Sequence, residues 1–169
     1  YAPPEKERYD KAVAAWMARR HHWNVSMDTC TQTTGVVTAM GIAIRALTEP
    51  GDGVIIQTPV YPPFAGSVRN NGRTLIENPL KCVDGVYTMD FEDLEEKAAH
   101  AKMLLLCSPH NPVGRVWTEE ELKKLGEICV KHSLFVLSDE IHFDLDYTGR
   151  HMVLTEACPE LRNHAIICT

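Results

Sequence analysis

Short apolar segments recur along the chain and predict buried strands. The runs at 103–107, 134–137 and 165–168 carry apolar side chains at consecutive positions. A strand that is covered on both faces shows this pattern, because neither face needs polar residues. The segments 54–56 and 72–76 predict two further strands.

Helical patterns lie between these strands. Residues 5–20 place apolar side chains on one helical face. Asp90 is a predicted N-cap, and Thr118 and Glu121 have the spacing of a capping box. We expect helices over 5–20, 38–47, 67–71, 91–101 and 118–132, and an irregular or briefly helical stretch over 149–162.

The alternation of strands and helices predicts the α/β class, with a mostly parallel sheet flanked by crossover helices. Internal repeats, low-complexity segments and flexible linkers are not evident in the sequence. We therefore expect residues 1–169 to form one domain, or most of one.

Composition narrows the function classes. The 169 residues are 44% hydrophobic and 24% charged, which suffices for a globular core. The net charge of −6 does not favour nucleic acid or an anionic membrane as a partner, so the basic stretch 19–23 is interpreted as a helix end. No apolar run approaches the ~20 residues of a membrane span, and no secretory signal is visible. Six scattered cysteines without a C-x-x-C motif favour buried thiols, a reducing compartment and a cytoplasmic location.

Polar or aromatic residues follow three of the predicted strands. Tyr61, Asn111 and Asp139 come after the runs at 54–56, 103–107 and 134–137. Ligands of open α/β sheets bind beyond the carboxyl ends of the strands. A carboxylate there is costly unless it meets a partner, so Asp139 is expected to hold a positive group. Tyr61, between prolines, either presents a flat face or packs in an ordinary turn.

A second weak signal precedes the predicted helix at 38–47. Gly35, Val36 and Val37 lie where backbone N–H groups at a helix start favour a phosphate. Many helices begin this way, so the pattern alone does not decide.

Three other α/β chemistries fit poorly. A P-loop needs a Gly-Lys pair, and the chain has none. A dinucleotide fold needs G-x-G-x-x-G after an early strand, and Gly51 and Gly53 do not form it. A metal site is not expected, because strand spacing splits the acidic and histidine side chains near Asp139 between two faces.

Two long motifs carry a resemblance to a known family. Residues 108–117 (SPHNPVGRVW) and 138–144 (SDEIHFD) resemble fold-type I enzymes that use pyridoxal 5′-phosphate (PLP), the aspartate aminotransferase-like group. Within that group the sequence is most similar to the C–S β-lyase branch, which includes cystalysin and the MalY/PatB-type cystathionine β-lyases. The resemblance covers essentially the whole chain, and the two long motifs are its specific part.

The resemblance implies a role for each candidate residue. Asp139 would pair with the pyridine nitrogen, Asn111 would bond the phenolic oxygen, and Tyr61 would stack on the ring. The phosphate would lie on the backbone N–H groups around Gly35, Val36 and Val37.

His142 and Tyr1 are two further positions that the resemblance addresses. Related aminotransferases usually carry tyrosine where this chain has His142, so the histidine favours a lyase; a structural histidine under the cofactor is the alternative. Tyr1 would match a tyrosine that reaches the neighbouring subunit's phosphate. Pro62 departs from the family, because close relatives carry a second tyrosine there.

The resemblance also implies that 1–169 is part of a large cofactor-binding domain. The lysine that forms the Schiff base in the family would lie beyond Thr169, so no catalytic residue is assigned within this chain. An N-terminal segment and a C-terminal small domain with its carboxylate-binding arginine would also lie outside it. The lysines present are expected on solvated helix faces.

The function implied for the whole protein is a PLP-dependent C–S β-lyase. It would cleave cystathionine or related cysteine S-conjugates to a thiol, pyruvate and ammonia, as a homodimer without nucleic-acid or membrane partners. An aminotransferase with the same cofactor site is one alternative. A non-catalytic fragment of a PLP domain is another.

Overall fold

The computed structural model describes residues 3–169, so the contact predicted for Tyr1 lies outside the described part. The chain divides into two compact units, 1–33 and 34–169, which are described separately. The first contains helix α1 (Pro3–His21), which confirms the helix predicted over 5–20, and a 3-10 turn, η1 (Met27–Thr29). Among the described residues, no helix is long and apolar enough to cross a membrane.

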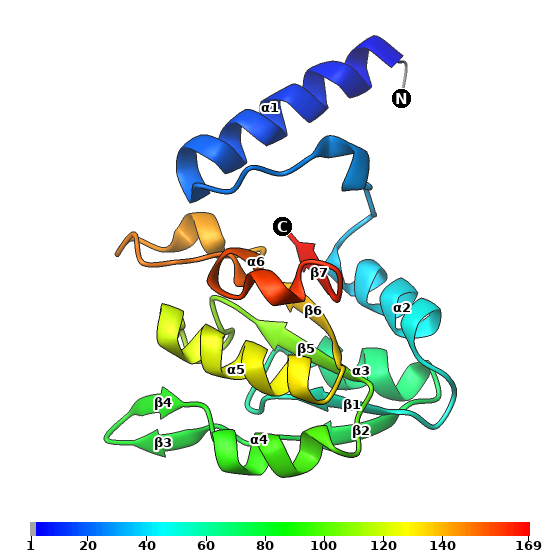
Figure 1. Ribbon diagram of the computed structural model, residues 1–169, viewed down its shortest axis with the longest axis vertical. Helices are drawn as coiled ribbons and strands as arrows, with labels where there is room; N and C mark the ends of the chain where they lie inside the picture. Colours follow the sequence, from blue (N-terminus) through cyan, green and yellow to red (C-terminus); the bar gives the residue numbers. More distant parts are fainter. Residues whose placement is uncertain (1–2) are drawn as a thin grey trace. The chain divides into compact units, whose positions relative to one another are not determined.

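The second unit is built on a five-stranded parallel sheet in the order β2-β1-β5-β6-β7 (Figure 1). This arrangement confirms the predicted sheet. The bounds of three strands differ from the prediction, since the strand expected at 54–56 begins one residue earlier, that expected at 72–76 lies at 74–77, and that expected at 134–137 lies at 135–139. The strands are β1 (Gly53–Ile56), β2 (Thr74–Glu77), β5 (Met103–Cys107), β6 (Phe135–Asp139) and β7 (Ala165–Cys168).

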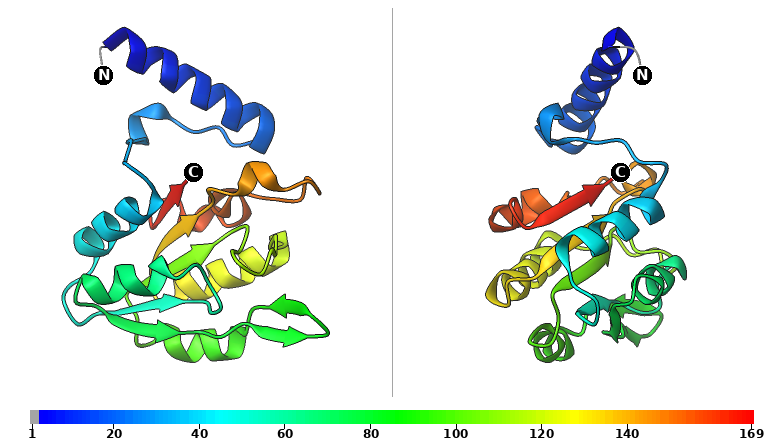
Figure 2. Two further views of the ribbon diagram at one scale, coloured as in Figure 1. Left: turned by 180° about the vertical axis from the view of Figure 1, so that it is seen from behind. Right: turned by 90° about the vertical axis from the view of Figure 1, so that its right-hand side faces the viewer.

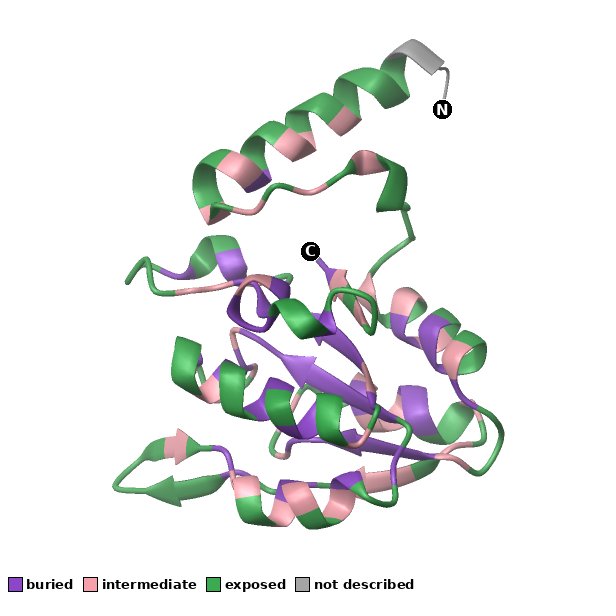
Figure 3. Ribbon diagram, in the orientation of Figure 1, coloured by how far each residue is buried: buried purple, intermediate pink, exposed green. Residues whose placement is uncertain are grey.

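Helices cover both faces of this sheet (Figure 2). One face packs against α2 (Val36–Leu47) and α3 (Pro63–Asn70). The other packs against α4 (Phe91–Ala98), α5 (Glu119–Lys131) and α6 (Leu154–Ala157). The central strands β1 and β5 are buried along their whole length, as expected for runs without polar positions (Figure 3).

The caps predicted for α4 and α5 are both present, whereas the predicted start of α2 is wrong. Asp90 caps α4 through the Asp93 N–H, and Thr118 and Glu121 form the predicted capping box of α5. The start of α2 was predicted two residues too late, because its N-cap is Gly35, whose φ of 144° suits glycine and which offers no capping side chain.

A two-stranded antiparallel hairpin was not predicted. It consists of β3 (Lys81–Val83) and β4 (Val86–Thr88), joined by Asp84 and Gly85, both with positive φ. Its residues are mostly exposed (Figure 3), so the apolar periodicity that marks a core strand is missing. Two 3-10 turns, η2 (Phe143–Leu145) and η3 (Pro159–Leu161), complete the second unit.

Candidate functional site

Three candidate residues meet at the carboxyl edge of the sheet. The strands that precede Tyr61, Asn111 and Asp139 are β1, β5 and β6, which are neighbours in the sheet. The N–H of Tyr61 donates to the carbonyl oxygen of Asn111 at 2.9 Å, so the loops after β1 and β5 are joined directly. The predicted convergence of these strand ends is therefore confirmed.

Asp139 is the last residue of β6 and lies in register with two thiols. Its neighbours across the sheet are Cys107 on β5 and Cys168 on β7. Residues in register on parallel strands point to the same face, and both thiols belong to the core beneath α2 and α3. The Asp139 side chain therefore faces α2.

The Asp139 carboxylate is almost enclosed. The residue is 6% exposed, and among the described residues only the Ile141 N–H donates to it, at 3.2 Å. Burial raises the pKa of this carboxyl, while the Ile141 N–H and the nearby His142 act to lower it. The site therefore carries a buried acid that gains stability if a cationic group meets it.

The loop that carries Asn111 is rigidly held. The N–H of His110 donates to the Arg115 carbonyl at 2.7 Å, and the Gly114 N–H donates to the His110 carbonyl at 2.8 Å. The Asn111–Pro112 bond, whose isomer the sequence left open, is cis.

Side chains after this loop anchor it to the rest of the second unit. Trp117 is buried, and its Nε1–H donates to the Cys107 carbonyl at 3.0 Å. The Arg115 guanidinium lies 4.9 Å from the centre of the Trp117 ring and forms two hydrogen bonds, of 2.6 and 2.7 Å, with the Glu121 carboxylate. These contacts fix the chain on one side of Asn111.

Cys107 forms two hydrogen bonds with the loop that carries Asn111, a role that the sequence did not indicate. The Asn111 N–H donates to the Cys107 sulfur at 3.3 Å, and the thiol donates to the Pro109 carbonyl at 3.4 Å. Burial raises the pKa of this thiol to about 12, so it stays protonated and can donate. The sequence signal available was a cysteine four residues before the asparagine.

His110 is a second residue that sequence reasoning did not assign. It is 1% exposed, and burial lowers its pKa, so the ring is neutral near pH 7. Its Nε2 lies 2.9 Å from the Pro59 carbonyl, which can only accept, so this nitrogen carries the proton. The ring also meets Trp117 edge-on, with 5.4 Å between ring centres. His110 therefore connects the loop after β5 to the end of β1.

The start of α2 contributes backbone N–H groups to the candidate site. The helix begins at Val36 after Gly35, and it packs against β6 and β7 on the face to which Asp139 points. No residue in the described part of the chain accepts a hydrogen bond from the Val36 or Val37 N–H. These N–H groups and the helix dipole suit an anion.

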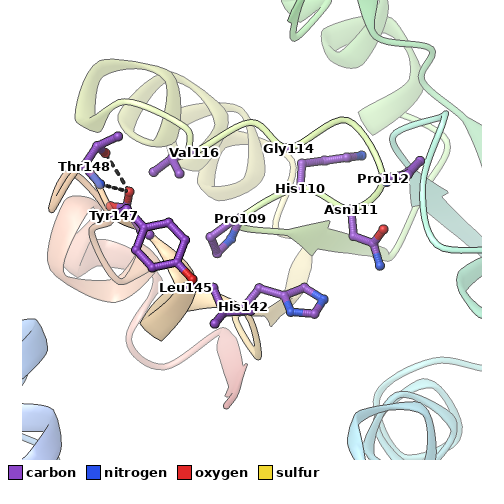
Figure 4. Close-up of a pocket in the computed structure, with 11 residues that line it drawn as sticks. Pro109, His110, Asn111, Pro112, Gly114, Val116, His142, Leu145, Tyr147 and Thr148 are labelled. Carbon is purple, nitrogen blue, oxygen red and sulfur yellow. Dashed lines mark hydrogen bonds between the residues drawn. The ribbon is translucent and has the colours of Figure 1, made fainter.

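A cavity of about 500 Å³ adjoins Asn111 and His142. Its walls come from residues of two segments, 109–116 before α5 and 142–148 after β6. Asn111 and His142 lie at one side of it, and Tyr147 and Thr148 at the other (Figure 4). Asp139 and Tyr61 do not line the cavity.

The acidic residues after β6 are used within the protein. Asp146 accepts hydrogen bonds from the N–H groups of Thr148, Arg150 and His151, at 2.7 to 2.8 Å. Although burial acts to raise it, a hydrogen bond from the Thr148 hydroxyl together with these backbone bonds brings the pKa of Asp146 to about 2. Over residues 3–169, no group of three or more His, Cys, Asp or Glu side chains is placed to hold a metal ion.

Comparison with known proteins places this site in a family. The model of "Aminotransferase class I and II" matches residues 1–168. Cystathionine beta-lyase PatB of Bacillus subtilis (strain 168) is 45% identical over 171 residues, which cover 99% of this chain and 44% of that protein. Protein MalY of Escherichia coli (strain K12) is 35% identical over 148 residues, which cover 86% of this chain and 38% of that protein. The chain thus spans less than half the length of these relatives.

Solved structures agree with this assignment. Cystalysin from Treponema denticola, whose structure contains a PLP cofactor, superimposes with a TM-score of 0.91 at 46% identity, covering 95% of this chain and 42% of that one. A PLP-bound C–S lyase from Staphylococcus hominis gives a TM-score of 0.91 at 30% identity, covering 95% of this chain and 42% of that one. The parallel sheet with helices on both faces is the aspartate aminotransferase-like architecture of these neighbours. The chain belongs to the aminotransferase class I and II family, whose enzymes depend on PLP.

Proposed function

We propose that the protein containing this chain is a PLP-dependent C–S β-lyase. Its substrate would be L-cystathionine or a related cysteine S-conjugate. One water is consumed, the Cβ–S bond breaks, and the products are a thiol, pyruvate and ammonia. The lyase class is supported by the names of the relative PatB and of a structural neighbour of this chain, the C–S lyase from Staphylococcus hominis.

Asp139 is the observation that carries the cofactor assignment. Its carboxylate is buried, faces α2, and meets a single backbone donor among the described residues. A protonated pyridine nitrogen would supply the missing cationic partner, and the pair would keep the ring protonated. When bound, PLP withdraws electrons from the substrate's Cα–H bond.

The remaining candidate residues would hold the other parts of the cofactor. The Asn111 side-chain amide, on its rigid loop, would donate to the phenolic oxygen. Tyr61 is 42% exposed beside Asn111, so its ring is accessible for stacking. The phosphate would accept from the Val36 and Val37 N–H groups, with Gly35 giving the backbone close access.

His142 would contact the cofactor from the segment after β6. Its side chain lines the same cavity as Asn111, and its charge influences Asp139. We propose that it lies beside the ring and helps to orient it.

Several features of the whole protein are part of the same proposal. Residues 1–169 would be part of the large cofactor-binding domain, with the Schiff-base lysine and the small domain elsewhere in the protein. The protein would be a cytoplasmic homodimer that acts on small amino acids.

The test uses the full-length protein with PLP and L-cystathionine, with and without a 2-oxo acid. Pyruvate and free thiol formed in equal amounts without the 2-oxo acid are expected. Amino transfer that requires the 2-oxo acid, without thiol release, would instead identify an aminotransferase. Asp139→Asn should lower the rate at least tenfold, whereas Asp52→Asn, in the turn at the opposite end of β1, should not.

A further inference from the structure

A fully buried carboxylate lies directly after Asp139 and has no part in the proposed cofactor contacts. Glu140 is 0% exposed, and its Oε1 accepts from the Ser138 hydroxyl at 2.8 Å and from the Leu154 N–H at 3.1 Å. Its Oε2 lies 2.8 Å from Nε2 of His151, whose side chain is 3% exposed. Burial of a carboxylate is tolerated only with such a complete set of donors.

This Glu140–His151 pair lies on the opposite side of the sheet from the cofactor site. Ser138 is in register with Leu106 and Ile167, which belong to the core beneath α4, α5 and α6. Glu140 bonds to Ser138 and to the first residue of α6, so it shares that side. The pair can therefore act on a cofactor through the main chain, in addition to the charge of Glu140, which acts to raise the pKa of Asp139.

The main chain of Glu140 connects β6 to the turn that carries His142. Its N–H donates to the Cys168 carbonyl at 2.8 Å, and its carbonyl accepts from the Phe143 N–H at 2.9 Å. The His142 carbonyl in turn accepts from the Leu145 N–H at 2.8 Å, which closes η2. Displacement of Glu140 would therefore move His142 as well as the adjacent Asp139.

The segment that follows Glu140, residues 141–151, is held at its C-terminal end by His151. The His151 ring packs edge-on against Phe143, with 5.9 Å between ring centres, and its N–H donates to Asp146. Between these anchors, Leu145 to Thr148 contribute one wall of the 500 Å³ cavity. The pair thus joins both ends of the segment that borders the site.

We propose that Glu140 and His151 are positioning residues for the cofactor site. Their buried contact holds the segment 141–151 on β6 and so sets where Asp139 and His142 meet PLP. This inference rests on the proposed function, because it assumes that PLP binds at Asp139.

The experiment measures two properties of the full-length protein reconstituted with PLP. One is the dissociation constant of PLP, and the other is the pH at which the visible absorption of bound PLP changes. For Glu140→Ala and His151→Gln we expect binding at least about tenfold weaker and a shifted pH midpoint. Glu140→Gln keeps an oxygen for Ser138 and Leu154, and its NH2 group can donate to Nε2 of a His151 ring that carries its proton on Nδ1, so it should bind PLP within about threefold of the wild type.

A second glutamate–histidine pair provides the matched control. Glu95 lies 2.5 Å from His132, which ends α5 before the start of β6, at the edge of the sheet away from the site. Glu95→Ala should leave both the dissociation constant and the pH midpoint unchanged.

The possible outcomes separate the two proposals. Absence of PLP binding by the wild type would contradict the proposed function. PLP binding by the wild type with unchanged affinity and pH midpoint in folded His151→Gln and Glu140→Ala would overturn the positioning role. Circular dichroism establishes that each variant is folded, and His151→Gln decides the question if Glu140→Ala does not fold.

Discussion

Asp139 links a cost in folding to its proposed role in binding. Burial disfavours the ionised carboxylate, and the described residues supply a single backbone N–H to it. Its folded-state pKa is therefore higher than its pKa in the unfolded chain. The cost is absent below the unfolded pKa of about 4 and grows as the pH rises through the folded-state value.

Asp139→Asn should therefore stabilise the cofactor-free protein at pH 8, by about 1 kcal/mol, and make no difference near pH 4. The Asn oxygen can still accept from the Ile141 N–H. Urea unfolding of both proteins at the two pH values measures this. A cofactor-free wild type that is more stable than Asp139→Asn at pH 8 would contradict the assigned environment.

Cys107 is expected to act through its hydrogen bonds to the Asn111 loop. Cys107→Ala removes both bonds and should weaken PLP binding by about fivefold, since one such bond contributes about 1 kcal/mol. Cys107→Ser retains a donor and an acceptor and should stay within about twofold. Cys129→Ala, which removes a buried thiol on the core-facing side of α5, serves as the control and should not change PLP affinity.

Among single residues, the sequence indicated the polar residues at the ends of strands. It did not indicate the buried residues that form hydrogen bonds to the same loops. Asn111 and Asp139 were evident because a polar side chain after a buried run is conspicuous. The Cys107 contact was missed because a cysteine in an apolar run reads as an ordinary core thiol. The Glu140–His151 contact was missed because it spans an irregular segment of 11 positions.

Helices of the second unit differ in how closely they approach their neighbours. Gly126 in α5 lies against α6, where a Cβ atom would come within 2.5 Å of the Cys158 sulfur. For Gly66 in α3, the nearest atom among the described residues is the Asn70 amide nitrogen, 3.9 Å from such a Cβ atom. The two glycines therefore provide a test of packing against intrinsic helix preference.

Gly126→Ala should destabilise the protein by about 1–3 kcal/mol, because the overlap outweighs the helix preference of alanine. Gly66→Ala should stabilise it, by up to about 1 kcal/mol. Thermal unfolding of the two variants and the wild type measures both effects. Stabilisation by Gly126→Ala would contradict the close contact between α5 and α6.

Elements were predictable where burial was two-sided or where a cap was visible in the sequence. Strands β1, β5 and β7, and the capping box of α5, were found where the sequence placed them, with β1 beginning one residue earlier. The hairpin β3–β4 was missed because its short strands lie outside the core. The end of α4 was placed too late, at residue 101 instead of Ala98, because Ala101 is buried although it lies beyond the helix.

The sheet of the second unit has two edge strands, β2 and β7. Within residues 34–169, β7 pairs on one side only, with β6. An edge strand with exposed apolar residues can pair with another chain, and Ile166 of β7 is 38% exposed. The 169-residue chain, when it is produced alone, is therefore expected to self-associate.

Ile166→Lys should reduce this self-association severalfold, because a charge on an edge strand opposes pairing. Light scattering of the 169-residue chain at increasing concentration measures the effect. Ile42→Lys, on α2, replaces a residue that is 48% exposed but lies outside the sheet, and it serves as the control. Equal reductions in both variants would point to general solubility, not to the strand edge.

The register of β6 limits how this chain can change by insertion and deletion. Asp139 faces α2 only because it pairs with Cys107 and Cys168. One residue inserted before Ser138 in β6 would reverse the faces of the residues that follow it. Ser138 would then face α2, and Asp139 would face α4, α5 and α6. Length variation among descendants of this sequence should therefore accumulate in the exposed β3–β4 turn and the outer ends of the helices, while the strands keep their lengths.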